Sequence, residues 1–276
     1  MHLHAKKSLG QHFLIDPKAH KRIVGSLAPK AADVVIEIGP GTGLLTRELL
    51  ASPLKKLIAF ELDARAIPEL RAMFENEGSR FVLEEQDFLE SDLGAIAERE
   101  ERKIRVVGNI PYYITSPILF KLIDERAVVR DALLLLQKEV AERLTAKPRT
   151  KAYGIPTVLA NFFGEVTYLF KILAGAFRPA PNVDSALVHI DFERDYFTRA
   201  GIPKPADFDE AAFRKLVRGL FAMRRKTIRN NLKAIAPTGE IERIEASAIS
   251  PFLNARAEEL SIEDFLKLHA ALLLTS

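Results

Sequence analysis

The stretch VVIEIGPGTGLLTRELL, residues 34–50, decides the fold. Its first five residues, Val34–Ile38, are apolar and mostly β-branched apart from one glutamate, which is typical of a buried strand in a parallel sheet. Three glycines follow within five residues, and from Leu44 onward the apolar residues recur at helical spacing. Glycines permit a tight turn and let backbone amides approach a ligand at the N-terminus of a helix. The stretch therefore predicts a strand, a glycine loop and a helix that together form a ligand site.

The same alternation of strand and helix continues on both sides of this stretch. Further strands are expected at Lys56–Phe60, Phe81–Glu84, Ile104–Gly108 and Ala132–Leu136, and helices at residues 44–51 and 64–76. Asp16 and Pro17 supply an N-cap and a first-turn proline for a helix to about Leu27, and Ser116 and Pro117 do so for a helix through Ile123. Alternating strands and helices predict an α/β fold with a parallel sheet covered on both faces.

The later part of the chain changes character twice. Residues 165–173 and 186–192 flank a proline-rich loop and predict an antiparallel hairpin at the edge of the sheet. From about Arg194 to Pro205 the sequence is polar with two prolines, and beyond it only helical patterns remain. We therefore predict two domains, residues 1–198 and residues 199–276.

Composition limits the possible chemistry. The chain of 276 residues has a net charge of +3 and a pI near 9.0, and it contains no cysteine, which excludes disulfides, thiolate metal sites and a cysteine nucleophile. The six histidines lack ligand spacing, so no metal site is expected. No apolar run reaches the 18 or so residues of a membrane span. We expect a soluble cytoplasmic protein with no membrane partner and no obligate protein partner.

Acidic residues follow the first three strands. Glu61 ends the second strand, 22 residues after Gly39, where a carboxylate can accept hydrogen bonds from both hydroxyls of a ribose. Asp87 follows the third strand and is suited to an adenine amine, whereas Glu37 either orients the glycine loop or reaches the ligand. A single acid at a strand end is usually a solvated residue or a helix cap, but three in series favour a nucleoside cofactor. The glycine spacing differs from the G-x-G-x-x-G of dinucleotide sites.

The fourth strand ends in Asn109-Ile110-Pro111-Tyr112, at the edge where open parallel sheets bind ligands. The Asn109 side-chain oxygen and the Ile110 carbonyl can accept the two hydrogens of an exocyclic adenine amine. Tyr112 can stack on an extruded base, and Phe177 can cover its other face. The alternative is an Asn-Pro turn with a packed tyrosine, and a core position for Phe177.

A basic run marks the second domain. Eight basic residues and no acidic residue lie between Ala212 and Lys233. This density favours contacts with RNA phosphates, although a solvated helix face is the alternative. Thr227 is placed to cap a helix from Ile228. The residues predicted to contact RNA are Arg214, Arg218, Arg224, Arg225, Lys226 and Arg229, with Lys6 and Lys7 as additional contacts near the target base.

Five motifs in order resemble the KsgA-type ribosomal RNA adenine dimethyltransferases. They are LGQHFL (Leu9–Leu14), EIGPGTG (Glu37–Gly43), NIPYYI (Asn109–Ile114), FRPAPNVDSA (Phe177–Ala186) and RRKTIRNNL (Arg224–Leu232). The resemblance covers nearly the whole chain. It implies a Rossmann-like class I methyltransferase with a mostly parallel seven-stranded sheet, followed by a small all-helical domain that recognises RNA.

The same resemblance implies a cofactor, a substrate and site residues. The cofactor is S-adenosyl-L-methionine, and the reaction is N6,N6-dimethylation of two adjacent adenosines in the 3′-terminal hairpin of 16S RNA, in the 30S subunit or its precursor. The positions that match cofactor contacts are Gln11, His12, Leu14, Gly39, Gly41, Glu61, Asp87 and Asn109. The family has Asn or His at the position of His12, and a main-chain contact there would make the side chain immaterial.

Three alternatives compete with this interpretation. A large-subunit dimethyltransferase of the macrolide-resistance type shares the glycine loop and the N-I-P-Y motif, but the C-terminal half favours the small-subunit enzymes. A non-enzymatic ribosome assembly factor is disfavoured by the intact Glu61, Asp87, Asn109 and Tyr112. An NAD-dependent oxidoreductase disagrees with the glycine spacing and leaves Asn109–Tyr112 unexplained.

Overall fold

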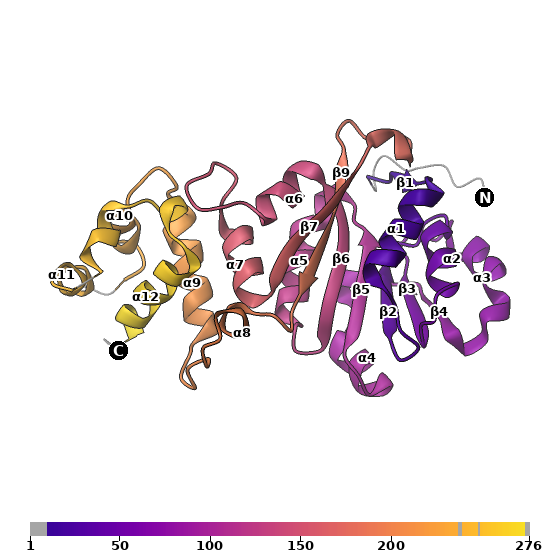
Figure 1. Ribbon diagram of the computed structural model, residues 1–276, viewed down its shortest axis with the longest axis horizontal. Coiled ribbons are helices and arrows are strands. Elements are labelled where there is room, and N and C mark those ends of the chain that lie inside the picture. The colour runs from indigo at the N-terminus through magenta and orange to yellow at the C-terminus, as the bar shows by residue number, and fades with distance from the viewer. Residues whose placement is uncertain (1–9, 237–238, 248, 274–276) are drawn as a thin grey trace. The chain divides into compact units, whose positions relative to one another are not determined.

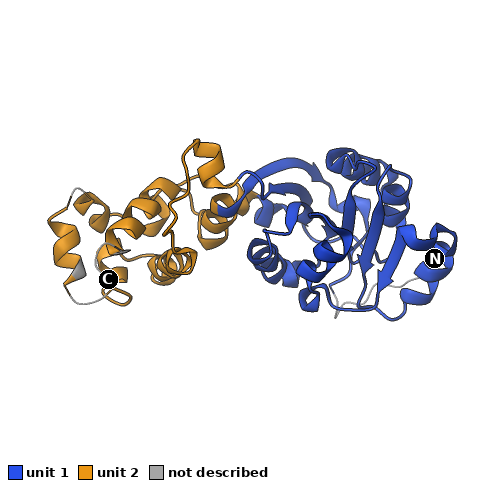
Figure 2. Cartoon of the chain, turned by 90° about the horizontal axis from the view of Figure 1, so that it is seen from below, with its two compact units in different colours: residues 1–141, 163–194 blue, residues 142–162, 195–276 orange. Residues whose placement is uncertain are grey.

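The computed structural model describes residues 10–236, 239–247 and 249–273, and these form two compact units. The first unit contains residues 1–141 and 163–194, and the second contains residues 142–162 and 195–276 (Figure 2). Residues 142–162, predicted from the sequence to lie in the catalytic domain, thus pack with the C-terminal part of the chain. The functional division into residues 1–198 and 199–276 stays a prediction.

A seven-stranded sheet forms the centre of the first unit (Figure 1). Its strands lie in the order β4-β3-β2-β5-β6-β9-β7. Every neighbouring pair from β4 to β6 is parallel, whereas β9 runs antiparallel to both β6 and β7. The predicted mixed sheet with an antiparallel edge is confirmed. The strand bounds are β2 Val34–Ile38, β3 Lys56–Phe60, β4 Phe81–Glu84, β5 Ile104–Asn109, β6 Val129–Gln137, β7 Glu165–Ile172 and β9 Ser185–Asp191.

Helices connect the parallel strands and pack around the sheet. All five residues of β2 are buried, and Ile36 pairs with Ile58 of β3 and with Val106 of β5. Apolar side chains on both faces of these strands therefore need helices to cover them. The helices of this unit are α1 Pro17–Leu27, α2 Leu44–Leu50, α3 Ile67–Met73, α4 Leu93–Glu100, α5 Thr115–Asp124 and the first part of α6 Lys138–Leu144.

Of the two helix N-caps predicted from the sequence, the structure confirms one and contradicts the other. Asp16 accepts a hydrogen bond from the Lys18 amide at 2.9 Å, and α1 begins at Pro17, as predicted. The predicted Ser116 cap is wrong, because α5 begins at Thr115 with Ile114 as its N-cap. The cause is a 3-10 turn over Tyr112–Ile114 that continues directly into the helix, so Ser116 lies in its first turn.

The N-terminal segment joins the first unit through a two-stranded ribbon. Strand β1, Phe13–Leu14, pairs antiparallel with β8, Phe177–Arg178. The Phe13 ring also lies against the glycine loop, where a Cβ atom at Gly41 would come within 2.9 Å of it. Gly41 has φ +53°, so both the backbone conformation and the close approach favour glycine there.

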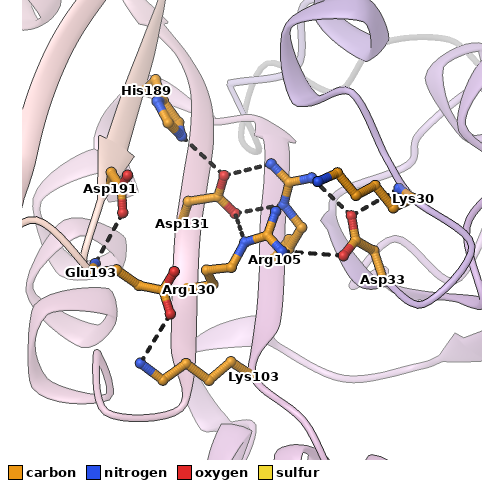
Figure 3. Close-up of polar contacts among 9 residues, drawn as sticks. All are labelled: Lys30, Asp33, Lys103, Arg105, Arg130, Asp131, His189, Asp191 and Glu193. Carbon is orange, nitrogen blue, oxygen red and sulfur yellow. Dashed lines mark hydrogen bonds and ion pairs between the residues drawn. The ribbon is translucent and has the colours of Figure 1, made fainter.

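A buried ion-pair network ties the amino ends of three parallel strands to β9 (Figure 3). Arg105 of β5 donates to both carboxylate oxygens of Asp131 on β6, at 2.7 and 2.6 Å, and to Asp33 before β2, at 2.9 Å. Asp131 is also 3.0 Å from the Nε2 atom of His189 on β9. These groups lie at the opposite strand ends from Asn109, so the network serves the stability of the sheet.

The second unit is helical in the part of it that the structure describes. An aromatic cluster forms part of its core: the rings of Phe162 and Phe213 lie 4.2 Å apart, with Phe197 and Phe208 against them. The helices of this unit are the end of α6, α7 Ile155–Phe163, α8 Tyr196–Ala200, α9 Glu210–Ala222, α10 Ile228–Leu232, α11 Glu240–Glu245 and α12 Ile262–Leu273.

Candidate active site and RNA-binding surface

A cavity of about 180 Å³ opens at the carboxyl ends of β2, β3, β4 and β5. This is the edge at which open α/β sheets bind ligands, because the loops there diverge. Most of the residues that the sequence assigned to the cofactor and the reaction meet in it. They are Gln11, His12, Gly39, Gly41, Glu61, Asp87, Asn109, Ile110, Pro111 and Tyr112.

A second hollow of about 30 Å³ adjoins the first and shares Phe13, Gly39 and Asn109 with it. Leu14, which does not line the larger cavity, lines this one together with Glu37 and other residues of the loop and of β5. The two hollows follow the glycine loop on both sides of Gly39. An elongated ligand along this loop would contact the N-terminal segment and the end of β5 together.

Glu61 forms part of the cavity wall with both carboxylate oxygens in use. Its Oε2 atom accepts a hydrogen bond from the Gly41 amide at 2.9 Å, and its Oε1 atom accepts one from the Asp63 amide at 2.8 Å. Burial raises the pKa of Glu61, while the two backbone amides act in the opposite direction. The amides fix the orientation of the carboxylate, whose remaining lone pairs can accept ribose hydroxyls.

Glu37 lies behind the glycine loop and is fully buried. The Thr46 hydroxyl donates to its Oε2 atom at 2.7 Å, which links β2 to α2 across the loop. Burial raises the pKa of Glu37 to about 8. Of the two roles predicted for Glu37, this geometry supports orientation of the loop.

Asp87 combines a capping role with a place in the cavity. It precedes the 3-10 turn Phe88–Glu90 and accepts a hydrogen bond from the Leu89 amide at 2.9 Å. It is half-buried, and it lines the larger cavity. The interpretation as a cap and the functional one as a ligand contact are therefore compatible, since only one oxygen is used by the cap.

Asn109 links the carboxyl end of β5 to the N-terminal segment. Its Nδ2 atom donates to the main-chain carbonyl of His12 at 2.8 Å. Among the described residues no group donates to the Asn109 side-chain oxygen. The amide is thus oriented with an acceptor available at the cavity, as the target-amine hypothesis requires.

Tyr112 lies beside His12 rather than beside Phe177. The rings of His12 and Tyr112 are stacked, with centroids 5.6 Å apart and planes at 25°. The Tyr112 hydroxyl is 3.2 Å from the Ser185 hydroxyl, and burial raises the Tyr112 pKa. A neutral, half-buried phenol with a fixed ring is suited to stacking on a base.

The predicted place of Phe177 over the other face of the base is not what the structure shows. Its side chain is 1% exposed and belongs to the core cluster, where β8 packs beside Leu14 of β1. It lines neither hollow. The structure corrects this assignment to a core role, which the single-residue pattern allowed from the start.

Two site features lay beyond the sequence patterns. Asp63 lines the cavity, accepts a hydrogen bond from the Gln11 side chain at 2.9 Å and is held by the Arg65 guanidinium, which lowers the Asp63 pKa. Ser185, in the quoted VDSA stretch, positions Tyr112. The only signal for Asp63 was its place two residues after Glu61.

The basic residues of the second unit that were predicted to contact RNA differ in their surroundings. Arg224 pairs with Glu258 at 2.7 Å, and Arg229 pairs with Glu245, so these two charges are partly neutralised within the unit. Arg225 and Lys226 are exposed. Arg214 and Arg218 lie on α9. Lys6 and Lys7 lie outside the described residues.

Thr227 occupies the N-cap position of α10, but its hydroxyl makes no capping hydrogen bond. The hydroxyl instead accepts a hydrogen bond from the Asn230 side chain at 3.1 Å. The predicted position of the cap is confirmed, and the predicted bonding is corrected.

Neither a metal cluster nor a membrane helix is found in the described part of the chain. Within residues 10–236, 239–247 and 249–273, no group of three or more His, Cys, Asp or Glu side chains has an arrangement that would hold a metal ion. In the same residues no helix combines the length and the apolar character that a membrane crossing requires.

Comparisons with known proteins agree on one family. The family profile described as ribosomal RNA adenine dimethylase matches residues 2–272. Proteins named ribosomal RNA small subunit methyltransferase A are 43% identical over 265 residues in Chlorobium phaeobacteroides (95% of this chain, 89% of the relative) and 40% identical over 277 residues in Geobacillus thermodenitrificans (97% and 91%).

Solved structures show the same architecture. A dimethyladenosine transferase from Plasmodium falciparum superposes with a TM-score of 0.76 at 27% identity, over 93% of this chain and 96% of that one. The 23S rRNA methyltransferase ErmE gives a TM-score of 0.68 at 26% identity, over 94% and 99%. The Rossmann-like class I methyltransferase fold predicted from the sequence is confirmed.

Proposed function

Because the chain belongs to the ribosomal RNA adenine dimethylase family, we propose that it uses S-adenosylmethionine to dimethylate N6 of two adjacent adenosines in the 3′-terminal hairpin of 16S RNA, within the 30S subunit or its precursor in the cytoplasm. The observation that carries the proposal is the orientation of Asn109, whose amide nitrogen is held by His12 so that the oxygen is left as an acceptor at the cavity.

The residues around the two hollows fit the cofactor. Both Glu61 and Asp87 line the larger cavity, which supports the proposal that Glu61 accepts hydrogen bonds from the ribose hydroxyls and Asp87 accepts one from the adenine amine. Gly39 and Gly41 let the loop approach the ligand, and Leu14 and Asn109 border the second hollow, where a methionine chain would extend. Gln11 and His12 close the site from the N-terminal segment. S-Adenosylmethionine supplies an electrophilic methyl group on a sulfonium when it is bound.

Residues Asn109–Tyr112, at the carboxyl end of β5, position the adenosine that accepts the methyl group. The adenine amine is a weak nucleophile because its lone pair is delocalised into the ring. Hydrogen bonds from the amine to the Asn109 oxygen and the Ile110 carbonyl favour the geometry in which the nitrogen lone pair faces the methyl group. Pro111 stiffens this turn, and Tyr112 supplies the stacking face. Rate enhancement then comes mainly from proximity and orientation.

The amine proton leaves after the nitrogen becomes cationic by methylation. Its acidity is then high enough for transfer to water, so no residue needs to act as a general base. Two rounds at each of two adenosines account for four methyl groups.

The small subunit is favoured over the large subunit by the relatives with the higher identity. The two relatives with 43% and 40% identity carry a small-subunit name, whereas ErmE, a 23S enzyme, is 26% identical. The basic residues of the second unit support a ribosomal RNA partner, with Arg225 and Lys226 among its exposed charges.

The test is methyl transfer to defined ribosomal particles. Purified protein is incubated with labelled S-adenosylmethionine and undermethylated small or large subunits, and N6,N6-dimethyladenosine is mapped, with Asn109→Ala as the control. We expect label at adjacent adenosines of small-subunit RNA that is absent with the variant. Label in the large subunit would move the assignment to the resistance-type enzymes, and no label in either would favour a non-enzymatic assembly role.

A further inference from the structure

The connection between α6 and α7, residues 145–154, is a basic segment outside the run that first indicated RNA binding. From Arg143 to Gly164 the chain carries four basic residues and no acidic residue. Three of them, Lys147, Arg149 and Lys151, lie in the connection and are exposed. Within the described residues no ion pair engages these three side chains, so their charges are available to a polyanion.

Arg224 holds this connection beside the turn that follows α9. Its Nη2 atom donates to the main-chain carbonyls of Lys151, at 2.5 Å, and Tyr153, at 3.1 Å. Its Nε atom donates to the Glu258 carboxylate at 2.7 Å. One guanidinium thus joins three parts of the second unit that are far apart in sequence, and it places Arg225 and Lys226 next to the connection.

Glu258 binds the connection through its main chain and pairs with Arg224 through its side chain. The Arg149 amide donates to the Glu258 main-chain carbonyl at 2.7 Å, while the Glu258 carboxylate pairs with Arg224. Arg149 has φ +69°, a left-handed conformation that non-glycine residues adopt only where the surroundings impose it. The acid that contacts the connection is therefore partly neutralised, and the connection is hydrogen-bonded to two other parts of the unit.

We propose that Lys147, Arg149 and Lys151 form one phosphate-binding surface with Arg225 and Lys226, and that Arg224 is the positioning residue that assembles it. The inference rests on the proposed function, and it assigns RNA contacts to a segment that the basic run does not include. Five exposed cations on two fixed backbone segments suit the backbone of a folded RNA, in which phosphates recur at short intervals. A cluster of this kind reads shape and charge and is indifferent to base sequence.

The test measures binding of undermethylated small subunits, and of their RNA stripped of protein, as a function of salt concentration. The variant Lys147→Ala/Arg149→Ala/Lys151→Ala should lower affinity at least about tenfold and reduce the slope of log K against log salt by roughly two, because each lost phosphate contact removes about 0.7 to 0.9 of slope. The matched control is Lys30→Ala/Arg99→Ala/Lys103→Ala, which removes three charges from the amino-end side of the sheet and should leave the slope unchanged. Thermal melting verifies that each variant is folded.

Arg224→Lys tests positioning separately from charge. Lysine keeps the charge, but its donors lie on one nitrogen and lack the planar fork by which Arg224 reaches Glu258 through Nε and the two carbonyls through Nη2. Affinity and slope should therefore both fall although the net charge is constant. An unchanged slope in the triple variant would overturn the inference, and so would a loss of affinity for subunits without a loss for the stripped RNA, which would indicate a protein contact. The variant Arg225→Ala/Lys226→Ala distinguishes failure of this inference from failure of the proposed function. If affinity falls in this variant but not in the triple variant, the inference is wrong and the proposed function stands. If affinity falls in neither variant, this unit does not recognise RNA.

Discussion

The side-chain amide of Asn109 and the main-chain carbonyl of His12 are joined by a hydrogen bond of 2.8 Å, across 97 residues of sequence. This bond connects the end of β5 to the segment that leads into β1, and both flank the cavity. It also decides which atom of the amide is left to accept a hydrogen bond from a substrate.

A substitution at Asn109 should show whether the bond to His12 anchors the N-terminal segment as well as orienting the side-chain oxygen. Asn109→Asp keeps an acceptor but replaces the donor by a carboxylate, which faces the His12 carbonyl and repels it. We expect Asn109→Asp to lower methyl transfer by at least about a hundredfold, equivalent to roughly 3 kcal/mol of transition-state stabilisation, and to weaken cofactor binding as the N-terminal segment loosens. Calorimetric titration with S-adenosylmethionine together with single-turnover methylation measures both effects. Cofactor affinity equal to that of the unchanged protein would contradict the anchoring role.

The pKa of Glu37 predicts how stability depends on pH. An unfolded glutamate titrates near 4.5, and the buried one titrates at about 8, so between these values the folded state binds more protons. Stability therefore decreases as the pH rises from about 4.5 to about 8, with a slope of at most about 1.4 kcal/mol per pH unit from this group. Glu37→Gln keeps an acceptor for Thr46 and removes the titration. Denaturant unfolding of the cofactor-free protein at pH 5 and pH 8 should show a smaller difference in the variant, and an equal difference would refute the assignment.

The ion-pair network predicts a loss of stability in acid. Although burial alone would raise it, hydrogen bonds from Arg105 and His189 lower the pKa of Asp131 to about 2. The folded state thus binds fewer protons than the unfolded one, and the contribution of Asp131, on the order of 2 kcal/mol, is present above about pH 4 and is lost as the pH falls through about 2.

Removing the central cation should be costly at neutral pH. Arg105→Met removes the cation that the buried Asp33 and Asp131 share and leaves them the weaker contacts with Arg130 and His189, so we expect a loss of about 3 to 5 kcal/mol in the free energy of unfolding. Lys103→Ala breaks only the exposed pair with Glu193 seen in Figure 3, and should cost less than about 1 kcal/mol. Urea unfolding of both variants measures the two losses in the free energy of unfolding. Similar losses would show that the buried network stabilises the sheet no more than an exposed ion pair does.

The hydroxyl of Tyr153 predicts a neutral or favourable substitution. It is buried without a hydrogen-bond partner among the described residues, and burial raises its pKa. Tyr153→Phe removes an unsatisfied polar group while keeping the ring, so the free energy of unfolding should stay equal or rise by about 1 kcal/mol. A loss greater than about 1 kcal/mol on thermal or denaturant unfolding would mean that a partner, such as an ordered water, satisfies this hydroxyl.

The strands of the large sheet were predictable because they are short apolar runs between turn residues. β2, β3 and β4 have the expected bounds, and β5 extends by one residue to Asn109. By contrast, β1 and β8 have two residues each, too few for any periodicity, and they exist only because distant segments pair. The start of α5 also depends on context, since the 3-10 turn before it removes the need for a side-chain cap.

The cofactor edge was predictable because strand ends of a parallel sheet must meet. Glu61, Asp87 and Asn109 come together from three separate strands for this reason. Contacts that depend on side-chain orientation were not predictable: Phe177 faces the core, and Arg224 is bound to backbone and to Glu258 where sequence suggested a free charge. Charge density alone does not distinguish a cation that contacts RNA from one that holds the surface together.

The second unit is built from two separate pieces of chain, and this limits how the protein can be dissected. The polypeptide leaves the first unit after residue 141, returns at residue 163 and leaves again after residue 194. A fragment ending at residue 198 would keep α7 but lose Phe208 and Phe213. The Phe162 ring would then lose two of its packing partners and become more exposed to solvent. An isolated catalytic fragment would thus require excision of residues 142–162 and a designed connection between residues 141 and 163. For the same reason, during synthesis on the ribosome the sheet cannot receive β7 and β9 until a segment belonging to the other unit has already emerged.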